Sequence, residues 1–211
     1  MATDYAALNA AKVYDVDAFT KRRYAQFARH IASAYRILDA GCGSGDGGAV
    51  LRRTNPSAHI EGLELVSARR AAIPAGIYNA VTVGDLATIE TESRFDVVVM
   101  GELIEHVPFT SLEQLVASAA NVLTPGGRIL LTTPNPHYML LRWRGGSILG
   151  GAHVSAHCPA VLSELLNHRG FGVTRVEGSG RVSQVIGVRF PLAVYGSYMI
   201  VAERREHANQ P

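Results

Sequence analysis

Apolar and polar residues alternate along the chain in two distinct patterns. Short apolar runs rich in β-branched residues predict buried strands, and longer stretches with apolar residues three or four positions apart predict amphipathic helices. The run at 95–100 is the clearest strand, because its apolar residues would face both sides of a sheet. The predicted strands are 37–40, 59–64, 78–83, 95–100, 128–133, 173–176 and 196–202.

Helical patterns lie between most of these strands. They are found at 15–34, 45–53, 67–70, 111–123 and 159–168, and Ser67 is expected to cap the third of them. Strands that alternate with helices indicate an α/β fold, a parallel Rossmann-like sheet with helices on both faces. The last two strands have no convincing helix between them, so the final strand is expected to be antiparallel.

We expect one domain over residues 1–211, since a single core is common at this length. The segment 137–157 is a long loop rich in glycine and aromatic residues, and such loops often cover or bind substrates. The stretch 180–195 is an insertion without a clear pattern, and residues 204–211 are expected to form a flexible tail.

The formal net charge is only +2, so the whole molecule does not attract nucleic acid strongly. Two cysteines, Cys42 and Cys158, are present, and the first lies inside a glycine turn, which argues against a disulfide and favours a reducing compartment. The first residues lack the apolar run of a signal peptide, and no stretch predicts a membrane span. We therefore expect a cytoplasmic protein that does not bind membranes.

The sequence is organised around the strand and glycine turn at 37–45, a local pattern that holds nucleotides in α/β sheets. Gly43–Gly48 fits the dinucleotide pattern G-x-G-x-x-G, but a single match is weak. Asp39 and Asp46 are poorly placed beside a pyrophosphate, whereas Asp39 suits an ammonium group. The turn alone allows either a dinucleotide or a methyl donor.

Acidic residues follow three successive strands. Glu64 can accept hydrogen bonds from both ribose hydroxyls, and Asp85 can accept one from an adenine amino group, with Leu86 along the ring. With Asp39 they describe a phosphate-free adenosine that carries an amino acid. The compound that fits this description is S-adenosylmethionine.

The turn at 39–45, Glu64, the stretch 84–86 and the sequence at 123–127 resemble those of the class I S-adenosylmethionine-dependent methyltransferases. This resemblance implies a seven-stranded sheet with the last strand antiparallel. It also implies an N-terminal helical segment, 1–35, over the cofactor, with Tyr14 and Arg23 as candidate contacts. The implied cofactor-binding residues are Asp39, Gly41, Cys42, Gly43, Gly45, Glu64, Leu65, Asp85, Leu86, Gly101 and Glu102.

A second cluster follows the strand at 95–100. Glu102, Glu105 and His106 are spaced so that one helical turn would place them on one face. Two carboxylates and an imidazole suit a divalent cation such as Mg²⁺. In the alternative interpretation an acid caps a helix and the histidine packs or acts alone, without metal. The segment also resembles the small-RNA 2′-O-methyltransferases, and this resemblance adds His153 as a fourth ligand and catalytic residue.

A metal in this position would lower the pKa of one of two vicinal hydroxyls, which indicates O-methylation. We expect a sugar hydroxyl, because the sequence lacks a broad basic face. The small size also resembles that of actinobacterial methyltransferases of methylmannose polysaccharides, which implies a mannoside or oligosaccharide as the partner. RNA ribose methylation, with Arg142 and Arg144 on phosphates, and metal-independent O- or N-methylation of a small molecule are the alternatives. The state would be monomer or homodimer. Further candidates are His137 and His157 as proton acceptors, and Tyr138 and Trp143 as stacking residues.

Overall fold

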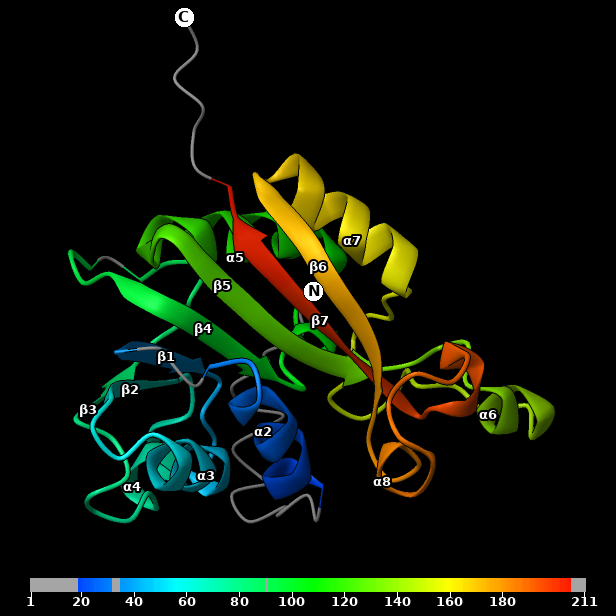
Figure 1. Ribbon diagram of the computed structural model, residues 1–211, viewed down its shortest axis with the longest axis horizontal. Helices are drawn as coiled ribbons and strands as arrows, with labels where there is room; N and C mark the ends of the chain where they lie inside the picture. The colour runs from blue at the N-terminus through cyan, green and yellow to red at the C-terminus, as the bar shows by residue number, and fades with distance from the viewer. Residues whose placement is uncertain (1–18, 32–34, 90, 206–211) are drawn as a thin grey trace, which may run out of the picture.

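The computed structural model describes residues 19–31, 35–89 and 91–205. Its centre is a seven-stranded sheet in the order β3-β2-β1-β4-β5-β7-β6 (Figure 1). The first five strands are parallel, and β7 runs antiparallel to both β5 and β6. The predicted seven-stranded sheet with an antiparallel last strand is confirmed. The strands are β1 Arg36–Ala40, β2 His59–Glu64, β3 Ala80–Val83, β4 Phe95–Gly101, β5 Leu123–Pro134, β6 Phe171–Ser179 and β7 Ser197–Arg204.

Side chains on the two faces of the sheet form two apolar clusters. One face, with Leu38, Val98 and Leu131, packs against α5 (Phe109–Val122) and α7 (Pro159–His168). The other face, with Ile37 and Val99, packs against α2 (Thr20–Ala28) and α3 (Asp46–Thr54). Because alternate residues of a strand point to opposite faces, the apolar run in β4 supplies both clusters, as predicted. The remaining short elements are α4 Ser67–Ala71, η1 Ile104–His106, α6 Met139–Trp143, α8 Ser183–Ile186 and η2 Leu192–Val194.

Several local predictions need correction. Ser67 lies inside α4, and the capping residue is Val66, whose side chain makes no cap hydrogen bond. Strand β3 begins at Ala80, because the Asn79 side chain accepts a hydrogen bond from the Ile60 amide. The predicted loop at 137–157 contains α6, and the insertion 180–195 contains α8 and η2. Residues 1–18 of the predicted N-terminal segment and most of the predicted tail lie outside the described residues.

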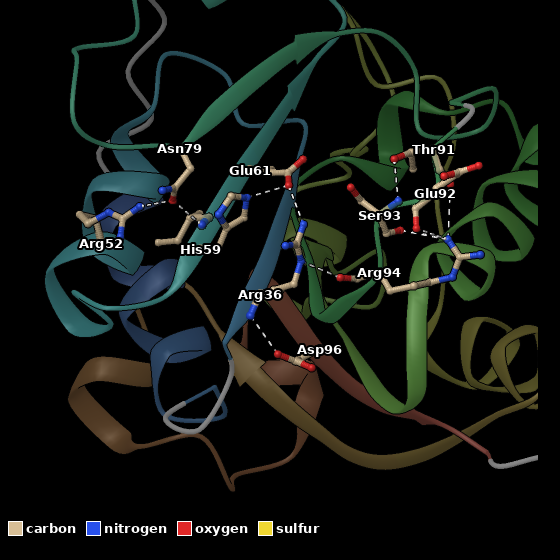
Figure 2. A network of polar contacts seen from close by, with 11 residues as sticks. Arg36, Arg52, His59, Glu61, Asn79, Thr91, Glu92, Ser93, Arg94 and Asp96 are labelled. Atoms are coloured by element: carbon tan, nitrogen blue, oxygen red, sulfur yellow. Dashed lines mark hydrogen bonds and ion pairs between the residues drawn. The ribbon is translucent and has the colours of Figure 1, made fainter.

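The amino-terminal edge of the sheet is held by polar contacts (Figure 2). Arg36 at the start of β1 donates to Glu61 in β2 and to the Arg94 carbonyl before β4. Asp96 accepts hydrogen bonds from the Tyr35 and Arg36 amides, both at 2.8 Å. These contacts link the amino-terminal ends of β1, β2 and β4. The loops that follow the carboxyl-terminal ends of these strands lie at the opposite edge of the sheet. Among the described residues no helix is long and apolar enough to cross a membrane.

Candidate functional site

A cavity of about 900 Å³ opens at the carboxyl-terminal edge of the sheet. The parallel strands β1, β2, β4 and β5 end there, β6 also ends there, and β7 begins there because it runs the other way. The cavity is large enough for a nucleoside-sized ligand together with a second small molecule. Its lining from these strand ends includes Gly41, Cys42, Gly43, Glu64, Leu65, Gly101, Glu102, Pro134, Gly180, Gly196 and Ser197.

The glycine turn forms one wall of this cavity. Gly41, Gly43 and Gly45 have φ of 73°, 57° and 89°, a left-handed conformation that strains any residue with a side chain. Glu64 at the end of β2 accepts hydrogen bonds from the Gly43 amide at 2.8 Å and the Val66 amide at 2.9 Å. The carboxylate of Glu64 therefore fixes the turn, and its remaining lone pairs are available to a ligand.

Asp39, in contrast, is fully buried and shielded by two tyrosines. The Tyr24 hydroxyl from α2 donates to Oδ1 and the Tyr78 hydroxyl to Oδ2, both at 2.6 Å. Burial raises the pKa of Asp39 to about 6, although both hydrogen bonds act in the opposite direction. Asp39 thus connects α2 and the segment before β3 to the start of the glycine turn.

The glycines that follow the turn make room for these two rings. A Cβ at Gly47 would lie 2.3 Å from Tyr24, and a Cβ at Gly48 would lie 2.1 Å from the Tyr78 hydroxyl. The last glycine of the G-x-G-x-x-G match therefore accommodates a tyrosine. Neither Tyr24 nor Tyr78 was identified from the sequence, and the adjacent glycines at the start of α3 were the signal for such a close approach.

The predicted cofactor-binding residues fall into two groups. Gly41, Cys42, Gly43, Glu64, Leu65, Gly101 and Glu102 line the cavity, whereas Asp39, Gly45, Asp85 and Leu86 do not. Asp85 is exposed and accepts a hydrogen bond from the Ala87 amide, and Leu86 is buried in the core cluster of α5. The roles of Asp85 and Leu86 at an adenine ring stay predictions. Tyr14 lies outside the described residues.

Three potential metal ligands also line the cavity and converge. One ligand atom each from Glu105, His106 and His153 lies within 4.8 Å of the others. The Glu105 side chain is fully buried; Oε2 accepts a hydrogen bond from Thr133 at 3.1 Å, and Oε1 has no hydrogen-bond partner among the described residues. Burial, together with the charge of Glu102, raises the pKa of Glu105 well above its ordinary value. A bound cation would compensate this buried carboxylate.

Both histidines of this cluster are oriented by backbone carbonyls. His106 Nδ1 lies 2.9 Å from the Ala152 oxygen, and His153 Nδ1 lies 3.0 Å from the Ile148 oxygen. A carbonyl only accepts, so each Nδ1 carries the hydrogen and each neutral ring has its lone pair on Nε2. This is the arrangement by which proteins orient histidine ligands of metals. The residues present therefore fit a divalent metal.

Glu102 takes a different position from the one the spacing predicts. The 3₁₀-helix η1 includes only Ile104–His106, and Glu102 precedes it with φ of 54°. The predicted helical turn over 102–106 is thus wrong for Glu102. Its Oε1 lies 3.2 Å from Arg23 Nε of α2, and both residues line the cavity. Glu102 and Arg23 form an ion pair beside the cluster of ligands.

The loop that carries His153 is fastened to η1. The amides of Val154 and Ser155 donate to the Glu105 carbonyl. The buried His157 Nε2 lies 2.7 Å from the Ser155 hydroxyl, which in turn lies 2.8 Å from the Val107 oxygen. His157 therefore holds the loop, and burial lowers its pKa.

Of the other loop residues proposed from the sequence, Tyr138 lines the cavity. His137 is exposed, and Trp143 is 80% exposed. Neither of these two lines the cavity.

Comparison with known proteins agrees with this geometry. Residues 13–176 match a family model described as a methyltransferase domain. Ubiquinone biosynthesis O-methyltransferase of Chromobacterium violaceum is 28% identical over 200 residues, which cover 84% of this chain and 82% of that protein. The corresponding protein of Hahella chejuensis is 35% identical over 108 residues, or 47% and 43% of the two chains.

Solved methyltransferases share the fold. The CcbJ methyltransferase of Streptomyces caelestis superposes with a TM-score of 0.72 at 19% identity, over 97% of this chain and 99% of that one. Magnesium protoporphyrin IX methyltransferase of Synechocystis, with bound S-adenosylhomocysteine, has a TM-score of 0.66 at 18% identity, over 87% and 83% of the chains. The chain belongs to the methyltransferase-domain family, and it is an S-adenosylmethionine-dependent methyltransferase.

Proposed function

We propose that the protein is an O-methyltransferase that uses a divalent metal held by Glu105, His106 and His153. Two observations carry this proposal: Glu105 Oε1 is buried without a hydrogen-bond partner among the described residues, and a carboxylate oxygen of Glu105 lies within 4.8 Å of ligand atoms of two carbonyl-oriented histidines. When bound, Mg²⁺ or a similar ion would lower the pKa of a coordinated hydroxyl. The ligands and the glycine turn line the same cavity, so a methyl donor and an acceptor would meet within it.

The residues of this chain would divide the remaining work. Glu64 and the amides of the glycine turn would hold the adenosine part of S-adenosylmethionine. Arg23, fixed by Glu102, would neutralise the carboxylate of its methionine part. Helix α2 lies over one side of the cavity, and with the His153 loop it would exclude water from the reacting atoms.

For the acceptor we propose a hydroxyl next to a second oxygen donor, because a metal can then bind both oxygens. A sugar hydroxyl, as in a mannoside, fits this description, and the buried Ser197 adds a polar side chain to the cavity lining. The related ubiquinone O-methyltransferases favour O-methylation in general, so an aromatic hydroxyl belongs in the same test. RNA is the weaker alternative, because Arg142 and Arg144 are exposed and do not line the cavity.

The metal is tested by His153→Ala, with His137→Ala as the matched control on the same loop. Binding of Mn²⁺ should be lost in the first variant and kept in the second, while both should bind S-adenosylmethionine like the wild-type protein. Both affinities are measured by titration calorimetry. Equal Mn²⁺ binding by His153→Ala, or full turnover after exhaustive chelation, would contradict the metal proposal.

The acceptor is tested with radiolabelled S-adenosylmethionine, with and without Mg²⁺. Mannosides, a catechol and short RNA are offered in parallel. Mg²⁺-dependent labelling of a mannoside is the expected result, and labelling of only the RNA or only the catechol would contradict a sugar acceptor.

A further inference from the structure

A second, smaller cavity of about 240 Å³ lies between α2 and the segment that follows β6. Both elements lie below the sheet in Figure 1, close to the end of β6. Gly180 lines this cavity and also the large one, so the two spaces meet at one backbone position. The lining residues of the smaller cavity are Arg22, Ala25, Gln26, Arg29, Gly180, Ser183, Gln184 and Val188.

The smaller cavity, called the groove from here on, is lined by positively charged side chains. Arg22 of α2 and Arg29, the residue that caps the end of α2, have exposed side chains and line the groove. Arg181 lines the large cavity next to the shared Gly180 and is also exposed. Glu177 in β6 does not line the groove, and it contacts Gln26, His30 and Arg175. No acidic residue is among the described residues that line the groove.

The groove is also held in shape. Gln26 is buried, and its amide donates to the Gly178 carbonyl at 3.1 Å, which fastens α2 to the end of β6. The Ser183 hydroxyl, at the start of α8, donates a hydrogen bond to the Gly180 carbonyl at 2.8 Å. This bond holds the start of α8 next to Gly180. Gly180 has φ of 89°, a left-handed conformation that favours glycine, and it lines both cavities.

We propose that this groove binds an anionic group of the methyl acceptor, a phosphate or a carboxylate, while the acceptor's hydroxyl lies in the large cavity. The arginines would bind the anion by charge-assisted hydrogen bonds, and the volume suits a single such group. This inference rests on the proposed O-methyltransferase function and narrows its substrates to acidic or phosphorylated hydroxyl compounds. It gives the insertion 180–195 the role of selecting the acceptor.

Binding can be tested without turnover, so that failure of this inference and failure of the proposed function are separable. Mannose, mannose 6-phosphate and mannuronate are titrated into the protein saturated with S-adenosylhomocysteine. We expect at least one charged sugar to bind at least tenfold more tightly than mannose. Tighter binding of mannose 6-phosphate would identify the anion as a phosphate, and tighter binding of mannuronate would identify it as a carboxylate. Equal affinities for all three sugars would overturn the inference, even if a neutral acceptor is methylated.

The double variant Arg22→Gln/Arg29→Gln identifies the groove, with Arg53→Gln on α3 as the control because Arg53 is exposed and lines neither cavity. The double variant should weaken binding of the charged sugar at least tenfold and leave mannose and S-adenosylmethionine binding unchanged. In turnover the loss should appear in KM and not in kcat. Unchanged binding of the charged sugar would overturn the inference, as would an equal loss for mannose or for the methyl donor.

Discussion

The buried carboxylate of Asp39 gives the free energy of unfolding a definite dependence on pH. The pKa of Asp39 is about 6 in the folded chain against an ordinary value of 3.8. Between these values the folded state holds a proton that the unfolded state has lost, so stability falls as the pH rises. Each pKa unit corresponds to about 1.4 kcal/mol, and the shift therefore makes about 3 kcal/mol available below about pH 4 that is absent above about pH 6.

The perturbation is Asp39→Asn, which keeps the shape of the side chain and removes its titration. Urea unfolding is measured for both proteins from about pH 4 to about pH 7, without the methyl donor. The wild-type protein should gain about 3 kcal/mol relative to the variant over this range as the pH is lowered. Because other groups titrate equally in both proteins, the difference isolates Asp39.

Tyr24→Phe supplies a second arm. The Tyr24 hydroxyl donates to Asp39 and lowers the pKa of that carboxyl. Removing the hydroxyl should therefore shift the pH at which stability is lost to a higher value. Tyr35→Phe is the control, since Tyr35 is 81% exposed. A wild-type-minus-variant difference that does not change with pH would refute the reasoning.

Three further changes test the walls of the site. Gly48→Ala should destabilise the fold by about 1–3 kcal/mol in urea unfolding, because its Cβ would lie 2.1 Å from the Tyr78 hydroxyl. Gly84→Ala is the control and should be nearly neutral, because the atom nearest to its Cβ would be 3.6 Å away. Equal effects of the two substitutions would contradict the packing argument. Glu64→Gln replaces one acceptor oxygen by an NH₂ donor and leaves the Gly43 or Val66 amide unpaired. The free energy of unfolding should fall by about 1–3 kcal/mol, and S-adenosylmethionine should bind roughly tenfold more weakly in calorimetry. An unaltered affinity would show that Glu64 does not shape the donor site. His157→Ala removes one hydrogen-bond partner of Ser155 and loosens the loop that carries His153, so Mn²⁺ binding should weaken while S-adenosylmethionine binding stays the same. A loss of both would point to general unfolding.

The strands of the sheet could be predicted because each is marked by a short run of apolar residues in the sequence. The apolar run of β4 is buried on both faces, and the helix from Pro159 to His168 has the predicted bounds. The short helix α6 was missed, since none of its residues is buried and no apolar stripe marks it.

The site was predictable in its composition more than in its contacts. Glu105, His106 and His153 come together although nearly fifty residues separate the last two, and the family resemblance supplied that connection. The spacing placed Glu102 on the same helical face, but its left-handed backbone turns it to Arg23. Asp39 looked exposed to a ligand, and only the folded chain shows the two tyrosines that cover it.

The reversed direction of β7 has a consequence for how this enzyme can diversify. Because β6 ends and β7 begins at the same edge, the connection between them leaves and re-enters the sheet beside the acceptor cavity. The part of this connection around α8, none of whose residues is buried, can therefore vary while the strand pairing stays intact, whereas Tyr195 is fully buried and accepts a hydrogen bond from Asn135. With the acceptor site proposed above, acceptor preference would change when this part of the loop is exchanged between related enzymes.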